Sequence, residues 1–290
     1  MKNILIFNDF SPEMEHAAQF ALLLAGKTNT TLHVCNTFNK AQSPANVEMV
    51  SYDINQIVPD LSFDKNSWIE ELESKLYSQT GLSPVVNIID DEDFSPDNIL
   101  SIVNRCDAGL LINGVLEDKQ HIAHIEKGLL CCSTRSGCPV LLVPEQFQCK
   151  AFEKIAYATD LRFCRQDIIH YLNNLATALT ASILIAGTAS AGLPHVDDSY
   201  ALKIFKEEIV QSVNHEHFYF DNIRERDILK VFDVLVNGMN NDLLVLVNHG
   251  YHFNELLGYD IPYVIPRNIR IPLLIFPSYR DFITFLFSNA

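Results

Sequence analysis

The sequence predicts two tandem α/β domains, each a doubly wound, Rossmann-like parallel sheet with helices on both faces. The chain repeats itself, because residues 3–37 and 154–188 superpose with an offset of 151 residues. Both halves also end in a similar phrase, PVLLVP at 139–144 and PLLIFP at 272–277. Continuously apolar strand segments alternate with helical ones, which is typical of a parallel sheet buried on both faces. A repeat of this length is a whole domain rather than a solenoid unit.

The first strand is expected at residues 4–7, where four apolar residues follow one another. The run Ser11-Pro12-Glu13 then combines an N-cap residue, a first-turn proline and an acidic side chain, so a helix begins there. Gly26 lies where this helix should end, because glycine readily adopts the left-handed conformation that closes a helix.

The rest of the first half follows from the same criteria. Trp68, Leu72 and Leu76 recur at helical spacing and predict a helix over 65–79. The remaining expected strands are 31–37, 84–89, 109–112 and 140–143, and a further helix is expected at 97–106.

The second half repeats this order of elements. Its strands are expected at 155–158, 183–186, 217–220, 243–247 and 273–276, and its helices at 166–180, 198–214 and 225–238. The boundary follows a strand that ends in proline, so we assign residues 1–147 to the first domain and 151–290 to the second.

Composition excludes several classes of partner. A chain of 290 residues that is 48% hydrophobic can bury two cores. A net charge of −15 argues against a nucleic-acid partner, which needs a basic face. No apolar stretch is long enough for a membrane span, and the polar N-terminus is not a signal peptide. Seven scattered cysteines are expected to be reduced thiols, so we expect a cytoplasmic protein without a membrane partner.

Candidate ligand-binding residues lie where strands end. In doubly wound sheets, ligands bind beyond the carboxyl ends of the strands. This rule places Asp9 and Asp160, which follow the first strand of each half, at the mouth of any site. It adds the loops after the fourth strands, at Gly114 and Gly250.

These residues resemble the universal stress protein family in its tandem, two-domain form. The resemblance is carried by Asn8-Asp9-Phe10-Ser11, Ala158-Thr159-Asp160, Asn248-His249-Gly250 and the stretch from Cys138 to Pro144. It implies five-stranded sheets of order 3-2-1-4-5 in both halves. It also implies that the fifth strands pair antiparallel in an internal pseudo-dimer, and a homodimer of two chains is compatible with it. Such pairing would cover an exposed strand edge in each half.

The ATP-binding branch of that family carries a glycine signature, in which small residues let backbone amides approach the phosphates. Its pattern is Gly, two residues, Gly, nine residues, then Gly and a hydroxyl residue. In the first half Gly114 opens the pattern, but Glu117 replaces the second glycine and would repel a phosphate. Gly128 then comes one place late and is followed by Leu129.

The second half keeps more of the signature. Val247 takes the first position, Gly250 the second, and Gly258 arrives two places early, before Tyr259. If the chain binds ATP or AMP, the resemblance therefore implies a site formed by Asp160, Gly250 and Gly258. Asp9 and Gly114 are the corresponding candidates in the first half.

The two aspartates admit two interpretations. Asp9 and Asp160 could hydrogen-bond an adenine or a ribose, or each could cap the helix that follows its strand. Both copies keep the aspartate at the same offset, and the sequence leaves the choice open.

Two histidine groups do not match a known metal pattern. His121 and His124 precede Cys131 and Cys132, and His215 and His217 flank Glu216, but neither spacing is typical of zinc. Buried thiols and helical histidines explain the first group more simply. In the second, a strand start would point both histidines to one face, where they could bind a metal, but a third ligand is missing. We therefore expect no metal.

Asp90, Asp91 and Asp93 follow the third strand and, with Asp9, resemble the acidic pocket of phosphorelay receivers. The long spacing and the missing lysine after the fifth strand argue against that function.

The sequence also carries no nucleophile elbow, phosphate loop or zinc-protease motif. We therefore expect a non-enzymatic binding or regulatory module in stress response, with degenerate nucleotide motifs and a small-molecule or protein partner. The alternative is an ATP- or AMP-binding protein with one working site in the second half. An enzyme that adenylates or hydrolyses a nucleotide is a third possibility, but no general base or metal set supports it.

Overall fold

One ten-stranded sheet runs through both halves of the chain, in the order β3-β2-β1-β4-β5-β10-β9-β6-β7-β8. This computed structural model describes residues 2–36, 65–90, 96–115, 129, 132–188, 194–213, 217–225, 227–248 and 270–278. The elements of the first half are β1 (Asn3–Asn8), α1 (Pro12–Thr28), β2 (Leu32–Asn36), α2 (Lys65–Thr80), β3 (Val86–Asp90), α3 (Pro96–Arg105), β4 (Ala108–Val115) and β5 (Val140–Pro144). Those of the second are β6 (Lys154–Thr159), a 3₁₀ turn (Leu161–Phe163), α5 (Gln166–Leu179), β7 (Ser182–Gly187), α6 (Asp198–Ile204), β8 (Phe218–Asn222), α7 (Ile228–Asp233), β9 (Leu243–Val247) and β10 (Leu273–Phe276).

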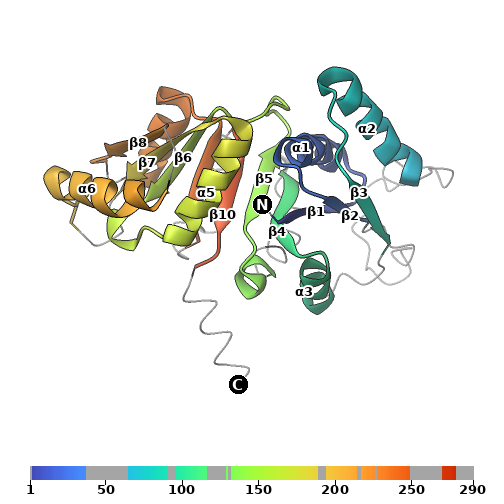
Figure 1. Cartoon of the computed structure of the whole chain (residues 1–290), viewed down its shortest axis with the longest axis horizontal. Coiled ribbons are helices and arrows are strands. Elements are labelled where there is room, and N and C mark those ends of the chain that lie inside the picture. Colours follow the sequence, from blue (N-terminus) through green and yellow to red (C-terminus); the bar gives the residue numbers. More distant parts are fainter. Residues whose placement is uncertain are drawn as a thin grey trace, which may run out of the picture.

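The sheet confirms both the order 3-2-1-4-5 in each half and the pairing through the fifth strands. β5 and β10 run antiparallel, with Leu142 opposite Leu273 and Val140 opposite Ile275, while the neighbouring strands within each half are parallel. Figure 1 shows the first half, blue to green, beside the second, yellow to red, with β5 and β10 at the centre. Since one sheet spans both halves, the division at 1–147 and 151–290 stays a prediction.

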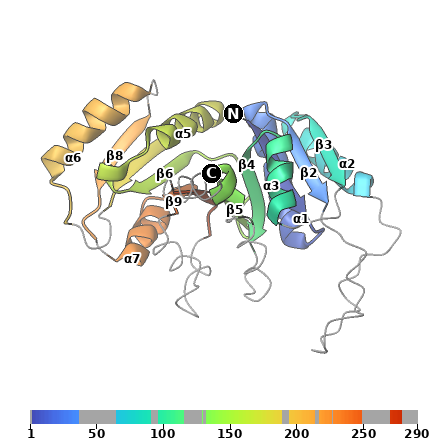
Figure 2. The same cartoon turned by 90° about the horizontal axis from the view of Figure 1, so that it is seen from below.

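Helices cover both faces of the sheet, as the continuously apolar strands require. Alternate residues of β1 point to opposite faces, so that Ile4 and Ile6 join one core cluster and Leu5 and Phe7 the other. Side chains of α1, α2, α5 and α6 fill the first cluster, and side chains of α3 and α7 fill the second. Figure 2 shows α6 and α7 on opposite sides of the strands of the second half.

The segment between the halves is anchored by aromatic rings. Phe147 and Phe152 lie in the connection between β5 and β6, and both are buried. Their ring centroids lie 6.0 and 5.2 Å from that of Phe20 in α1. Tyr171 of α5 adds a contact across the junction, because its hydroxyl donates to the Gly109 carbonyl at 3.2 Å. The two halves therefore share core contacts as well as a sheet.

The first helix begins as predicted but ends later. The Ser11 hydroxyl accepts from the Met14 amide at 3.3 Å, which confirms the N-cap. The end expected at Gly26 is wrong, since α1 continues to Thr28 and closes at Asn29 with a φ of 52°. At Gly26 a side chain would meet Leu82, with Cβ atoms 3.0 Å apart. This glycine serves the packing of the helix, and an asparagine supplies the left-handed cap.

The second half closes its equivalent helix with a less suitable residue. Thr180 lies 151 positions after Asn29 and adopts a φ of 60° at the end of α5. A β-branched side chain is strained in this conformation, at a cost of about 1 kcal/mol or more. Both cap residues are exposed.

Thr180→Gly is therefore expected to raise the free energy of unfolding by about 0.5–1 kcal/mol, because glycine adopts a positive φ without strain. Chemical denaturation of the full chain measures the change. Asn29→Gly is the matched control and should change stability by less than about 0.5 kcal/mol, since asparagine tolerates this conformation. A destabilised Thr180→Gly variant would show that the hydroxyl or the methyl group makes a contact worth more than the strain.

The later helices of the second half differ from the expected ranges. α6 was expected to continue to residue 214, but it passes into a π-helical turn at Phe205–Ile209 and a 3₁₀ turn at Val210–Ser212. α7 likewise gives way to a π-helical turn at Val234–Gly238. Such turns widen a helix locally and depend on tertiary packing, so hydrophobic spacing does not reveal them.

Two further expectations concern cysteines and membranes. The six cysteines within the described ranges are all free thiols, and four of them are buried. Within the same ranges, no helix combines the length and the apolar character needed to cross a bilayer.

Candidate functional site

At the carboxyl end of β1, Asp9 is exposed and organises the turn before α1. Its Oδ1 atom accepts a hydrogen bond from the Ser11 amide at 2.9 Å. Asp9 thus stabilises the turn, whereas Ser11 is the N-cap of α1, and a contact of Asp9 with a ligand stays a prediction. The neighbouring Asn8 is fully buried, and its amide donates to Asn36 Oδ1 at 3.2 Å.

Gly114 lies near the end of β4, where the first turn of α1 approaches the strand. Its amide donates to the Met14 sulfur at 3.2 Å. A Cβ atom at this position would lie 2.4 Å from the Glu13 carbonyl oxygen. The absence of a side chain at Gly114 is thus required by the backbone of α1, whether or not any phosphate is present.

The carboxyl end of β6 is built differently, because its aspartate is buried and paired. Asp160 Oδ1 accepts from the Arg162 amide at 3.1 Å and from Arg162 Nε at 2.8 Å. Asp160 Oδ2 accepts from Arg162 Nη2 at 2.5 Å. The aspartate side chain is 3% exposed and the arginine side chain 27% exposed. Asp160 therefore caps the 3₁₀ turn and also fixes a guanidinium group in a bidentate pair.

The pair has a clear electrostatic consequence. The hydrogen bond to Asp160, followed by its negative charge, raises the pKa of Arg162 above the ordinary arginine value. The guanidinium therefore stays charged at every pH at which the protein is folded.

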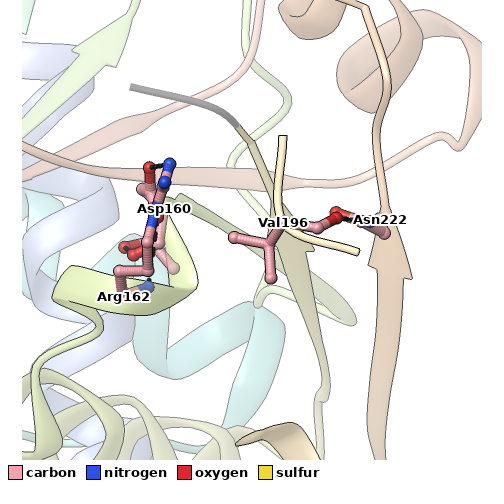
Figure 3. Close-up of polar contacts among 5 residues, drawn as sticks. Asp160, Arg162, Val196 and Asn222 are labelled. Carbon is pink, nitrogen blue, oxygen red and sulfur yellow. Dashed lines mark hydrogen bonds and ion pairs between the residues drawn. The ribbon is translucent and has the colours of Figure 1, made fainter. Parts of the chain in front are cut away.

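A second set of contacts lies at the carboxyl end of β8, two strands from β6 in the sheet. Asn222, at the end of β8, donates through its amide to the Val196 carbonyl at 3.1 Å and to Asp198 Oδ1 at 2.6 Å. Arg224 forms an ion pair with Asp198. In Figure 3 the Val196 side chain points toward Asp160 and Arg162 while its backbone is turned to Asn222. The Asn222 contacts thus hold the segment that carries Val196 against the end of β8.

The structure places three of the five predicted site residues, and it does not bring the two aspartates together. Asp9 and Asp160 follow β1 and β6, which are separated in the sheet by β4, β5, β10 and β9. Gly250 and Gly258 lie outside the described residues, as do His121, His124, Cys131, His215, Asp91 and Asp93. In the part of the chain that the structure describes, no three His, Cys, Asp or Glu side chains are placed to hold a metal ion.

Sequence reasoning missed Arg162, Val196 and Asn222. Arg162 follows Asp160 by two positions. This spacing alone does not distinguish an arginine that pairs with the aspartate from one whose side chain is solvated. Val196 precedes α6 and Asn222 ends β8, so they meet only where the start of α6 packs against the end of that strand. The sole sequence signal for the site was the aspartate itself.

Comparison with known proteins bears on the fold. No protein-family model matches the chain, and no curated protein matches it. A universal stress protein from Archaeoglobus fulgidus DSM 4304 matches with a TM-score of 0.58 and 12% identity, over 96% of this chain and 99% of its own. A protein of unknown function from Pseudomonas aeruginosa PAO1 matches with a TM-score of 0.57 and 13% identity, over 100% and 98%.

The cytoplasmic domain of a prokaryotic cation chloride cotransporter matches with a TM-score of 0.51 and 10% identity, over 94% of each chain. Identities this low show the fold alone. The chain has the fold of the universal stress proteins along nearly its whole length.

Proposed function

From this shared fold, we propose that the chain is a non-enzymatic binding and regulatory module of the universal-stress type, acting in the cytoplasm in stress response. In this proposal neither half recognises an adenine nucleotide in the manner of the ATP-binding family members. The bound partner is a small molecule or a protein. A nucleic acid is a poor candidate, because a net charge of −15 repels a phosphate backbone.

The observation that carries the proposal is the engagement of Asp160. Its carboxylate accepts three hydrogen bonds from Arg162 and is almost entirely buried. A ligand that needs this carboxylate must first displace a bidentate guanidinium, which would leave a buried charge unpaired. The first half supports the same conclusion, because the backbone of Glu13 occupies the space in front of Gly114.

A thermal-shift experiment with matched probes tests the proposal. Any ligand that binds the native state raises the melting temperature by mass action. We expect millimolar ATP with Mg²⁺ to raise it by no more than tripolyphosphate with Mg²⁺ does, within about 0.5 °C, and adenosine to have no effect. The comparison isolates recognition of the adenosine moiety from simple attraction of an anion.

The alternative function, an ATP- or AMP-binding protein with one site in the second half, makes the opposite prediction. A shift with ATP that exceeds the tripolyphosphate shift, together with a shift by uncharged adenosine that is lost in Asp160→Ala but kept in Asp9→Ala, would establish the alternative. Circular dichroism of both variants at the start of the melt confirms that they are folded.

A further inference from the structure

We infer that Arg162 makes the carboxyl edge of the second half a binding site for a carboxylate or phosphate group carried on an apolar body. Asp160 is then the positioning residue of this site and makes no contact with the ligand itself. The inference deepens the proposed binding function and rests on it. It follows from how the pair is built and from what lies beside it.

Asp160 has little capacity left for a ligand. A carboxylate offers about four lone-pair positions for hydrogen bonds. Three are taken by the Arg162 amide, Nε and Nη2, and the side chain is 3% exposed. A hydrogen-bond donor or a cation approaching this edge therefore meets the guanidinium before it meets the carboxylate.

Arg162 keeps the donors that Asp160 does not use. A guanidinium carries five N–H groups in a planar fork, and the pair with Asp160 engages only Nε–H and one N–H of Nη2. Among the described residues, no other hydrogen bond or ion pair of the guanidinium is present. With 27% of the side chain exposed, the remaining N–H groups can reach a ligand.

The pair also orients these donors in advance. An arginine held at two points loses little further conformational freedom when an anion binds, and this lowers the cost of binding. Planar donors in a fixed direction suit the oxygen atoms of a carboxylate or phosphate. Because Arg162 stays charged, the site does not depend on protonation of the protein.

The apolar part of the expected ligand follows from Val196. This side chain packs against the core cluster and points toward the Asp160–Arg162 pair in Figure 3. Both amide hydrogens of Asn222 are used, on Val196 and Asp198, so that Asn222 fixes the wall of the site and offers no further donor. We therefore expect the ligand to join an anionic end, which Arg162 binds, to an apolar body on the side to which Val196 points in Figure 3.

The test uses simple probes on the full chain at low ionic strength, where a surface cation is least screened. Benzoate and phenyl phosphate carry the anion on an apolar ring, and benzyl alcohol carries no charge. At about ten times their dissociation constants, the two anions are expected to raise the melting temperature by about 2 °C. Benzyl alcohol should have no effect, and the shift should decrease as salt is added.

Arg162→Gln should abolish the shift. Arg135→Gln is the matched control, because Arg135 is 25% exposed and pairs with Asp97 at 2.7 Å in the first half. Its response to benzoate should equal that of the natural protein. If Arg162→Gln alone unfolds, the double variant Asp160→Asn with Arg162→Gln removes both charges and tests the same point.

The inference is overturned if the anions give no shift, if benzyl alcohol shifts the melt equally, or if the shift survives in a folded Arg162 variant. These failures are distinct from a failure of the proposed function. An adenosine-dependent shift that needs Asp160 would overturn the proposed function itself. The absence of any response to benzoate and phenyl phosphate, without a nucleotide response, would remove only the anion site.

Discussion

Phe152→Ala is expected to lower the free energy of unfolding of the whole chain by about 4 kcal/mol, the usual cost of removing a fully buried phenylalanine ring. Phe152 is 1% exposed, and its ring lies 5.2 Å from Phe20 and 6.1 Å from Phe147 between centroids. The residue belongs to the connection between the halves, but its main partner is in α1. Its loss should therefore weaken both halves together.

Urea denaturation with two probes measures this effect. Trp68 is the single tryptophan and lies in α2, so its fluorescence reports the first half, whereas circular dichroism reports the helices of both. We expect both signals to change in one common transition at lower urea than in the natural protein.

Phe163→Ala is the matched control for Phe152→Ala. This ring is 54% exposed, and its removal should cost less than about 1 kcal/mol. Two separated transitions in the natural protein, or a loss below about 1.5 kcal/mol for Phe152→Ala, would contradict a shared core between the halves.

Gly114→Ala is expected to destabilise the protein by about 3 kcal/mol, at the upper end of overpacking costs. The added methyl group would lie 2.4 Å from the Glu13 carbonyl oxygen and 2.7 Å from its carbonyl carbon. These are backbone atoms in the first turn of α1, so no side-chain rotation relieves the clash. The turn that Ser11 caps must shift away from β4.

The same urea experiment measures the loss, and Gly238→Ala serves as the control. A Cβ at Gly238 would meet only a Val234 methyl carbon at 3.8 Å, an ordinary contact, so that variant should be neutral or slightly stabilised. If Gly114→Ala keeps full stability, packing does not explain this glycine, and its expected role in a phosphate loop regains support.

Gly114 also shows where sequence reasoning reaches its limit. The glycine signature of the ATP-binding branch assigned it to phosphate binding, whereas the structure gives it a packing contact with Glu13, about 100 residues earlier in the chain. Gly26 is a second example. It was expected to end the helix, but in the structure it provides the space that Leu82 occupies. The sequence alone does not show whether a glycine is needed for a turn, for a ligand or for the close approach of two elements.

The features that the sequence determined are those whose causes are local. Apolar runs marked the ten strands, the Ser11 cap marked the start of α1, and the internal repeat predicted that the second half would copy the first. The order of the strands and the pairing of β5 with β10 were predicted from a family resemblance. That resemblance was carried by a few short motifs and by their order along the chain. Hydrophobic periodicity and helix capping depend on residues that are close together in the chain. Such local patterns can therefore be recognised in the amino-acid sequence alone.

Tertiary structure decided the rest. The end of β6 buries the Asp160 carboxylate that Arg162 pairs with, whereas Asp9 is exposed and has Ser11 in the position that corresponds to Arg162. Val196 and Asn222 meet only where the start of α6 packs against the end of β8. Burial sets the strength of a charge pair, and strand order sets which distant side chains meet, so both follow only from the folded chain.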